Sequence, residues 1–176
     1  AIWTPAHATN YNASRSAAVS AVTVHTTQGS YAGAISWFQN STSNVSAHYV
    51  IRSSDGQVTQ MVRNAHTAWH VRNQNSYTLG IEHEGYVNNS AWYTNAMYAA
   101  SAALVRDFCA KRRIPFVSGS GDTRLLAEKE DLSIEEAARR LRYDFLRQAA
   151  ADGGYDAVFT AHHADDNAET VLLNLV

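Results

Sequence analysis

A histidine at the end of a predicted strand is the first side chain of this sequence that could do chemistry. Residues 21–30 read AVTVHTTQGS, so a β-branched run delivers His25 to a polar, glycine-containing loop. A sheet fixes the backbone of such a residue, which suits a metal ligand because metal ligands need tight positioning. The alternative is a strand-end histidine that hydrogen-bonds to a backbone carbonyl.

Two carboxylates end a second predicted strand. Residues 78–85 read TLGIEHEG, which predicts a buried strand that presents Glu82 and Glu84. Because side chains alternate across a strand, both carboxylates point to one face, and Ile81 and His83 point to the other. Carboxylates at the end of an apolar strand are costly unless something uses them. For Glu84 we favour the interpretation of a solvated strand end.

A loop that is both polar and aromatic precedes that strand. Residues 64–76 carry His66, Trp69 and His70. Binding residues are concentrated on loops that a rigid scaffold positions, so this composition indicates a binding loop. The alternative is that Trp69 and His70 simply pack on the preceding strands.

Periodicity elsewhere predicts alternating strands and helices. An Asp-Gly turn between two β-rich runs predicts a hairpin, and a Ser-Ile-Glu-Glu capping box predicts the start of a long helix. In chain order we expect a strand at 22–25, a helix at 31–40, a hairpin at 47–52 and 57–62, a strand at 78–85, and helices at 94–113 and 133–151. A strand at 156–161 and a helix at 167–176 would then form one half of a parallel α/β unit.

The density of charge changes sharply along the chain. Of its 30 Asp, Glu, Lys and Arg residues, seven lie in residues 1–105 and 23 in residues 106–176. The front is rich in Ser, Thr, Asn and Trp, whereas the back is rich in Arg, Glu, Asp and Leu. We therefore predict two domains of different origin, residues 1–108 and residues 109–176.

Composition excludes several classes of protein. The 176 residues are 45% hydrophobic, enough to bury a core. The sequence has no run of about 18 apolar residues, the length that a membrane span needs. No segment has the pattern of a signal peptide. The net charge of −2 predicts no nucleic-acid partner. Cys109 is the single cysteine, so an internal disulfide framework is excluded.

The motifs of the front half together resemble a known enzyme family. They read, in order, VTVHTTQGSYAGAISWFQN, SAHYVIRSSDGQVTQMV, AWH and TLGIEHEGY. Over roughly residues 1–110 the chain resembles the zinc-dependent N-acetylmuramoyl-L-alanine amidases of the phage-lysozyme and peptidoglycan-recognition type. The resemblance implies an α/β fold with a mixed central sheet flanked by helices. It also implies action on peptidoglycan or a muropeptide, at the amide that joins N-acetylmuramic acid to L-alanine.

The resemblance implies roles for individual residues. The strand histidine of the family is a zinc ligand, which corresponds to His25, and the glutamate of the GIE strand is the catalytic base or transition-state stabiliser, which corresponds to Glu82. Some phage members carry a tyrosine where this chain has Ala47, which favours the glutamate mechanism. Zinc polarises an amide carbonyl and lowers the pKa of bound water to about 7, so Glu82 can take that proton. The residues expected to line the groove for sugar and stem peptide are Trp69, His70 and Asn73.

The back half departs from that family and resembles another. The amidases have two further zinc ligands after the long helix, a histidine in a Gly-His pattern and then an aspartate or cysteine, and neither follows the helix here. Over about residues 109–176 the chain instead resembles the ATP-pyrophosphatase domain of tRNA(Ile)-lysidine synthetase, through RRIPF, SIEEAARRLRYDFL and DAVFTAHHADDNAETVLLNLV. The nucleotide-binding Ser-Gly-Gly-x-Asp-Ser loop of that domain is missing, and we interpret residues 118–123 as an imitation of it. We therefore expect a chimera in which an amidase-like sheet precedes a helix–strand–helix α/β fragment.

One hypothesis restores a zinc site. DAVFTAHH is a strand that ends in Ala-His, locally similar to the strand and Gly-His of the amidases. We hypothesise that His162 binds zinc together with His25, with Asp165 or Asp166 as the third ligand. The alternative is that the two aspartates cap the N terminus of a helix, which requires no metal.

Three functional hypotheses follow from these observations. The first is a zinc-dependent amidase whose activity is limited by its incomplete ligand set. The second is a peptidoglycan-binding module without catalysis. Both predict an extracellular or cell-wall-associated monomer. The third is a fragment of an ATP-dependent tRNA(Ile)-lysidine synthetase, which would be cytoplasmic, and for which the missing phosphate loop predicts no ATP binding.

Overall fold

The chain forms two compact units. The computed structural model describes residues 1–158, and the first unit is Ala1–Phe116, with the second beginning at Val117. The first unit reaches Phe116 because this ring packs against a buried cluster that contains Leu79 and Phe108. The predicted boundary between residues 108 and 109 concerns the origin of the sequence, and it stays a prediction.

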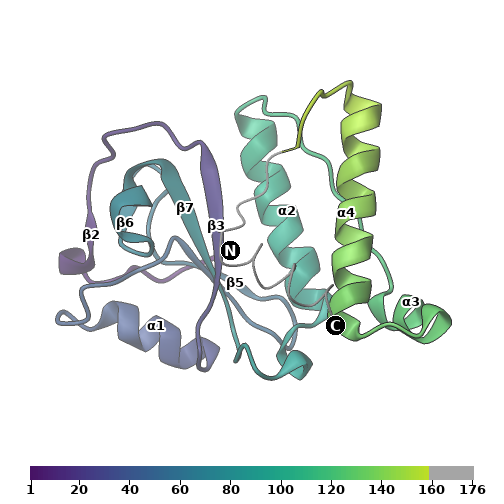
Figure 1. Cartoon of the computed structure of the whole chain (residues 1–176). Coiled ribbons are helices and arrows are strands. Elements are labelled where there is room, and N and C mark those ends of the chain that lie inside the picture. Colours follow the sequence, from purple (N-terminus) through teal and green to yellow (C-terminus); the bar gives the residue numbers. More distant parts are fainter. Residues whose placement is uncertain (159–176) are drawn as a thin grey trace. The chain divides into compact units, whose positions relative to one another are not determined.

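The first unit is built on a mixed five-stranded sheet (Figure 1). In spatial order its strands are β1 (Ile2–Trp3), β5 (Val58–Gln60), β4 (Tyr49–Ile51), β7 (Thr78–His83) and β3 (Ala21–Thr26). Strand β7 pairs in parallel with both β4 and β3, whereas β4 and β5 are antiparallel. A separate antiparallel pair joins β2 (Tyr11–Asn12) to β6 (Thr67–Ala68). The predicted α/β class with a mixed central sheet is confirmed.

The turn between β4 and β5 shows why the sequence forms a hairpin there. Gly56 has a φ of 72°, a conformation that favours glycine. A Cβ atom at this position would also lie 2.5 Å from the carbonyl oxygen of Ala96. The Asp-Gly pair therefore supplies both the turn and the close approach of the next helix, and the predicted hairpin is confirmed.

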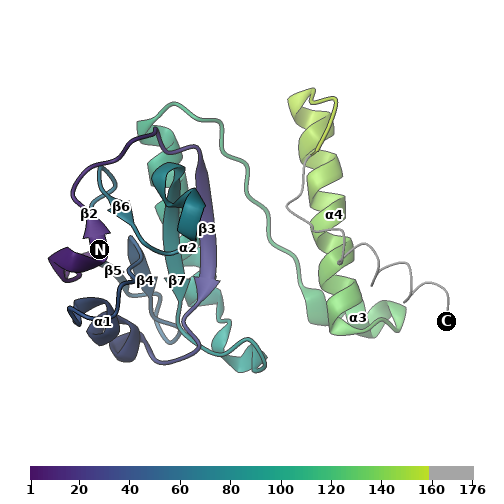
Figure 2. The same ribbon diagram turned by 60° about the vertical axis from the view of Figure 1, so that its left-hand side comes forward.

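Two helices cover opposite faces of the sheet, as the two views show (Figures 1 and 2). They are α1 (Tyr31–Gln39) and α2 (Asn95–Lys111), close to the predicted helices at 31–40 and 94–113. Strand β4 is buried on both sides because its residues alternate: Val50 joins the cluster with Phe38 of α1, whereas Tyr49 and Ile51 join the cluster with Met97 of α2. The first unit thus has one core on each face of the sheet.

Glu84 lies in the interior, so the expectation of a solvated strand end is wrong. The residue is 8% exposed. Its Oε1 accepts a hydrogen bond from the Tyr31 amide at the start of α1 (2.8 Å), and its Oε2 accepts one from the Ser53 amide (2.8 Å). Tyr31 and Ser53 lie far from Glu84 in the sequence, so a local pattern could not predict this role. The carboxylate joins the first turn of α1 to the end of β4.

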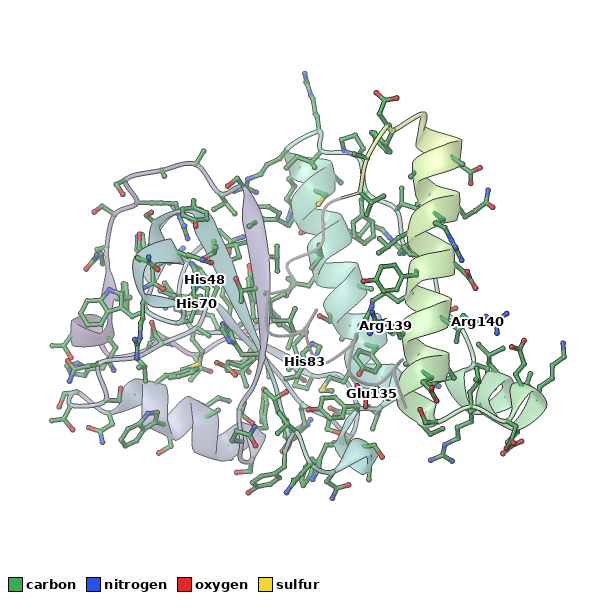
Figure 3. All side chains as sticks on the ribbon, viewed as in Figure 1. His48, His70, His83, Glu135, Arg139 and Arg140 are labelled. Atoms are coloured by element: carbon green, nitrogen blue, oxygen red, sulfur yellow. The ribbon has the colours of Figure 1, made fainter. Side chains whose placement is uncertain are left out.

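The described part of the second unit consists of two helices. They are α3 (Thr123–Glu130), which the sequence did not predict, and α4 (Ile134–Gly153), which starts at the predicted Ser133–Glu136 capping box. Asp122 caps α3, so the segment that imitates a phosphate loop leads into a helix N terminus. Figure 3 shows Glu135, Arg139 and Arg140 on α4. Residues 156–158 form no strand, and the rest of the strand predicted at 156–161 lies outside the described residues, as does the helix predicted at 167–176.

Three short 3-10 helices complete the described elements. They are η1 (Ala8–Asn10), η2 (Arg72–Tyr77) and η3 (Ser90–Trp92). In the part of the chain that the structure describes, no helix combines the length and apolar character that a membrane crossing needs.

Replacing Glu84 by alanine should destabilise the first unit. The substitution leaves the amide of Tyr31 and the buried amide of Ser53 without an acceptor, which we expect to lower the free energy of unfolding by about 3 kcal/mol. Urea unfolding followed by tryptophan fluorescence measures this, because all four tryptophans lie in Ala1–Phe116. The control Asp107→Ala removes an exposed carboxylate and should change the value by no more than about 0.5 kcal/mol. An equally small change for Glu84→Ala would contradict the proposed role.

Candidate active site

The parallel pairing of β3 and β7 places His25 beside Glu82. The two residues are Cα partners in the ladder, so their side chains project from the same face of the sheet. On the other side of β7, Glu82 is paired with Val50 of β4, which packs in the core beneath α1. The strand-end histidine and the glutamate of the GIE motif are therefore neighbours on the α1 face.

A third side chain reaches this face from the loop before β7. His70 Nδ1 lies 3.1 Å from His25 Nε2, and the two rings meet edge to face with centroids 5.4 Å apart. The ring of His70 rests directly on Gly80, where a Cβ atom would lie 2.6 Å from His70 Cγ. Glycine at this position of the GIE motif thus makes room for His70, which Figure 3 shows close to His48.

The hydrogen-bond network assigns the protons on this histidine pair. Thr78 Oγ1 donates to the carbonyl oxygen of Gln74 (2.8 Å), so it accepts from His70 Nε2 (3.1 Å). With the proton on Nε2, His70 Nδ1 is an acceptor, and His25 Nε2 donates to it. His70 is then neutral with its proton on Nε2, and the network gives the donor in its contact with His25 as Nε2 of His25.

A half-buried arginine, Arg15, holds the loop that carries His70. The guanidinium of Arg15 contacts Nε2 of His48 at 2.8 Å. It also donates to backbone carbonyls along the loop and the start of β7, namely those of Asn64, His66, Asn75, Ser76 and Thr78. Five carbonyls bound to one rigid donor group fix the path of the loop, and with it the position of His70.

Burial dominates the electrostatics of this cluster. It raises the pKa of Glu82 to about 7, and Glu82 Oε2 is buried with no hydrogen-bond partner among residues 1–158. Burial, followed by the charges of His25 and Arg15, lowers the pKa of His70 to about 4. Burial also lowers the pKa of His25, and that of His48 to about 3. At neutral pH the histidines are therefore uncharged, and Glu82 is balanced between its acid and its carboxylate.

The other predicted site residues are placed differently. Trp69 is half-buried, and its backbone is tied to Ser46 by hydrogen bonds of 3.1 Å in both directions. Asn73 is an exposed residue of η2, and no hydrogen bond within the described chain joins it to the histidine pair. The structure thus brings together His25, His70 and Glu82 of the predicted set.

Sequence patterns did not predict Arg15 or His48 as parts of this site. Arg15 lies in a polar segment without periodicity, and its carbonyl partners become neighbours only in the fold. One signal was available: residues 1–105 contain only four arginines and no lysine. An isolated charge in such a segment is a candidate for a buried structural role, because a buried charge needs many partners.

The described residues do not fit the zinc site that the family resemblance implies. His25 Nε2 and His70 Nδ1 are 3.1 Å apart, near the spacing of roughly 3.3 Å that two nitrogens have on one tetrahedral zinc. Catalytic zinc nevertheless takes three protein ligands. Among residues 1–158 no group of three or more His, Cys, Asp or Glu side chains is placed to hold a metal ion. His162, Asp165 and Asp166 lie outside the described residues.

Comparison with protein families identifies both halves of the chain. Residues 15–131, more than half of the chain, match the N-acetylmuramoyl-L-alanine amidase family, and residues 94–176 match the PP-loop domain. The fold supports the first match: the structure of PlyL superposes with a TM-score of 0.51 at 16% identity, over 65% of this chain and 75% of PlyL.

Curated relatives of each half give the same division. N-acetylmuramoyl-L-alanine amidase A of Achromobacter lyticus is 54% identical over 114 residues, which are 65% of this chain and 64% of that protein. The tRNA(Ile)-lysidine synthase of Chlorobaculum tepidum is 46% identical over 76 residues, which are 43% of this chain but 23% of the synthase. The chain therefore spans less than two thirds of either relative.

The chain belongs to the N-acetylmuramoyl-L-alanine amidase family. Its back half carries sequence related to tRNA(Ile)-lysidine synthases. Both resemblances predicted from the motifs, and the chimera that they imply, are confirmed.

The raised pKa of Glu82 predicts how its replacement alters stability with pH. The pKa of this carboxyl is about 7 in the folded chain and 4.5 as its ordinary value, so the wild type loses stability as pH rises from about 4.5 to about 7. Glutamine does not titrate. The difference in unfolding free energy, Glu82→Gln minus wild type, should increase by roughly 3 kcal/mol between pH 4 and pH 8. Urea unfolding in EDTA measures it. A difference that does not depend on pH would contradict the burial of this carboxyl.

Proposed function

We propose that the front unit of this chain engages peptidoglycan at the amide between N-acetylmuramic acid and L-alanine. The observation that carries the proposal is the cluster of His25, His70 and Glu82 at the carboxyl ends of two parallel strands. In open α/β sheets, ligands bind beyond the carboxyl ends of the strands. The cluster also lies within the segment that matches the amidase family.

In the proposed reaction Glu82 is the proton carrier. Amide hydrolysis requires a group that takes a proton from the attacking water and returns it to the leaving amine. A carboxyl with a pKa of about 7 is suited to both steps at neutral pH. Its Oε2, which has no hydrogen-bond partner within residues 1–158, leaves a lone pair for the water. His25 and His70, neutral and hydrogen-bonded to each other, add no charge that would pull the pKa down.

We propose the flanking loop as the binding surface for sugar and stem peptide. Trp69 and His70 belong to the loop that Arg15 fixes, and Asn73 is exposed on η2 of the same loop. An aromatic side chain beside polar groups is typical of loops that bind ligands. On this proposal the partner is peptidoglycan or a muropeptide and the place of action is the cell wall or the extracellular space, with the chain acting as a monomer.

The second candidate function is binding without hydrolysis. It is favoured by the ligand set, because residues 1–158 supply two neighbouring imidazoles and no group of three metal ligands. A domain that kept the groove but lost the metal would still recognise the muropeptide. The two candidates share a binding site and differ only in turnover.

Turnover and binding of a muropeptide separate the candidates. N-Acetylmuramoyl-L-alanyl-D-isoglutamine is the probe, with amine release and isothermal titration as readouts. If the chain hydrolyses it, Glu82→Gln should lower kcat by about 10²–10⁴-fold and leave Kd within about twofold, and Asp107→Asn should change neither. Binding without hydrolysis would support the second candidate function. If the chain neither binds nor hydrolyses the probe, both candidate functions are contradicted.

Zinc content tests the hypothesis that His162 completes a metal site. After dialysis against micromolar zinc, the full chain should retain less than one zinc per molecule, because two imidazoles alone do not form a tight tetrahedral site. Atomic emission analysis of wild type, His25→Ala and His162→Ala provides the measurement. One zinc per chain that is lost in both variants would contradict this expectation and would support His162 as a ligand. Stoichiometric zinc that survives His162→Ala would reject His162.

A further inference from the structure

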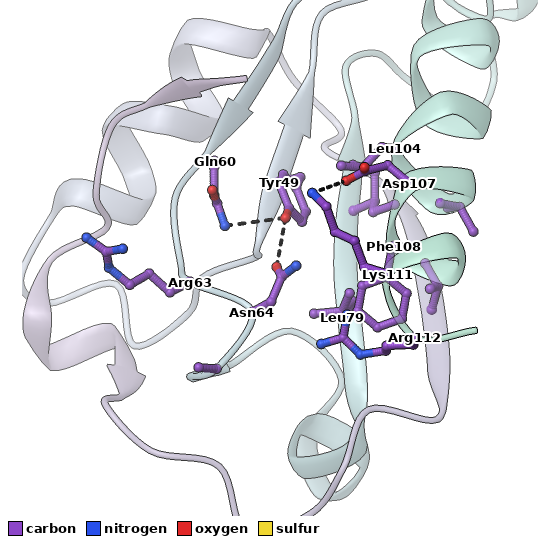
Figure 4. Close-up of a pocket in the computed structure, with 14 residues that line it drawn as sticks. Tyr49, Gln60, Arg63, Asn64, Leu79, Leu104, Asp107, Phe108, Lys111 and Arg112 are labelled. Atoms are coloured by element: carbon purple, nitrogen blue, oxygen red, sulfur yellow. Dashed lines mark hydrogen bonds and ion pairs between the residues drawn. The ribbon is translucent and has the colours of Figure 1, made fainter. Parts of the chain in front are cut away.

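The first unit contains a cavity on the face of the sheet opposite to the candidate active site. It has a volume of about 390 Å³, within the range of small-molecule sites. Figure 4 shows it between α2 and the strands. Val22 and Ile81 line it. Val22 lies three residues before His25 on β3, and Ile81 lies directly before Glu82 on β7. Because side chains alternate along a strand, both point away from the α1 face. The cavity is thus separate from the histidine pair.

The interior of the cavity is apolar with one polar wall. Its apolar lining includes Leu79, Leu104 and Phe108. On the polar wall the Tyr49 hydroxyl donates to Asn64 Oδ1 (2.7 Å) and accepts from Gln60 Nε2 (3.3 Å), as Figure 4 shows. Burial raises the pKa of Tyr49 above its ordinary value, so this hydroxyl stays neutral at physiological pH. A ligand inside therefore meets apolar side chains and neutral dipoles.

The charged lining is mainly positive. Arg63, Lys111 and Arg112 carry three positive charges, and Asp107 carries one negative charge. Lys111 Nζ lies 2.7 Å from Asp107, but both side chains are exposed, and such pairs are weak. The lining therefore has a net charge of +2.

The two arginines contact aromatic rings instead of carboxylates. Arg112 Cζ lies 3.7 Å from the centroid of the Phe108 ring, and Arg63 Cζ lies 4.9 Å from that of Trp3. Neither arginine forms an ion pair with a carboxylate within residues 1–158. Stacking on a ring occupies the face of a guanidinium and leaves its N–H groups available to an anion.

We propose that this cavity binds a small amphipathic carboxylate. Its apolar body lies against Leu79, Leu104 and Phe108, and its carboxylate is held by Lys111 and Arg112. The positive charges of the lining favour a carboxylate head group, and its apolar side chains favour an apolar tail. The proposal goes beyond the action on peptidoglycan, because it concerns the opposite face of the sheet and involves none of His25, His70 and Glu82.

Binding of decanoate to the full chain tests the proposal, with decan-1-ol and decylamine as ligands that have the same tail but a different head. Isothermal titration should give saturable binding of decanoate that is at least about tenfold tighter than that of either comparator, since a hydrogen bond between charged groups is stronger than one to a neutral head group. The double variant Lys111→Gln, Arg112→Gln should lose this advantage. Arg124→Gln, which removes an exposed charge on α3, should retain it.

A variant that fills the cavity tests its location. Leu104→Trp should abolish binding of decanoate and of decan-1-ol. Leu104→Phe provides the same test if circular dichroism shows that the tryptophan variant does not fold. Three results would overturn the proposal: no saturable decanoate binding up to millimolar concentration, decan-1-ol binding as tight as that of decanoate, or an unchanged decanoate affinity in the double variant or in a folded Leu104 variant.

Discussion

The parallel register between β3 and β7 is the constraint on which the rest of the first unit depends. Six consecutive residue pairs fix it. A shift by one residue would exchange the two faces, so the same register sets His25 beside Glu82 on the α1 face and sends Val22 and Ile81 toward α2. The candidate active site and the cavity are two consequences of one alignment of strands.

Charged side chains that are half-buried or buried are the second organising feature. Arg15 has no carboxylate partner in the described chain and is satisfied by backbone carbonyls, and Glu84 is satisfied by two backbone amides. Each joins segments that are distant in sequence, because its backbone partners come from more than one of them. Glu82 Oε2 is buried and has no such partner within residues 1–158, and burial without compensating hydrogen bonds raises the pKa of Glu82 to about 7.

Local sequence patterns predicted the elements better than they predicted the connections between them. The Asp-Gly hairpin, the Ser133 capping box and the places of His25 and Glu82 near the ends of their own strands follow from rules that operate over a few residues. The pairing of these two strands joins residues far apart in the sequence, so local rules do not predict it. Nor do they predict the burial of Glu84, because its partners belong to α1 and to the end of β4. Helix α3 escaped prediction because its eight residues carry too short a periodic signal.

The ring of His70 reports most directly on the central claim, which is that the Arg15-held loop delivers this histidine onto Gly80 beside His25. Long-range ¹H–¹⁵N correlation spectra of the metal-free chain measure its tautomer and its pKa. We expect a neutral ring with its proton on Nε2, and a pKa of about 4. A ring that titrates near 6.5, or that carries its proton on Nδ1 at neutral pH, would contradict it.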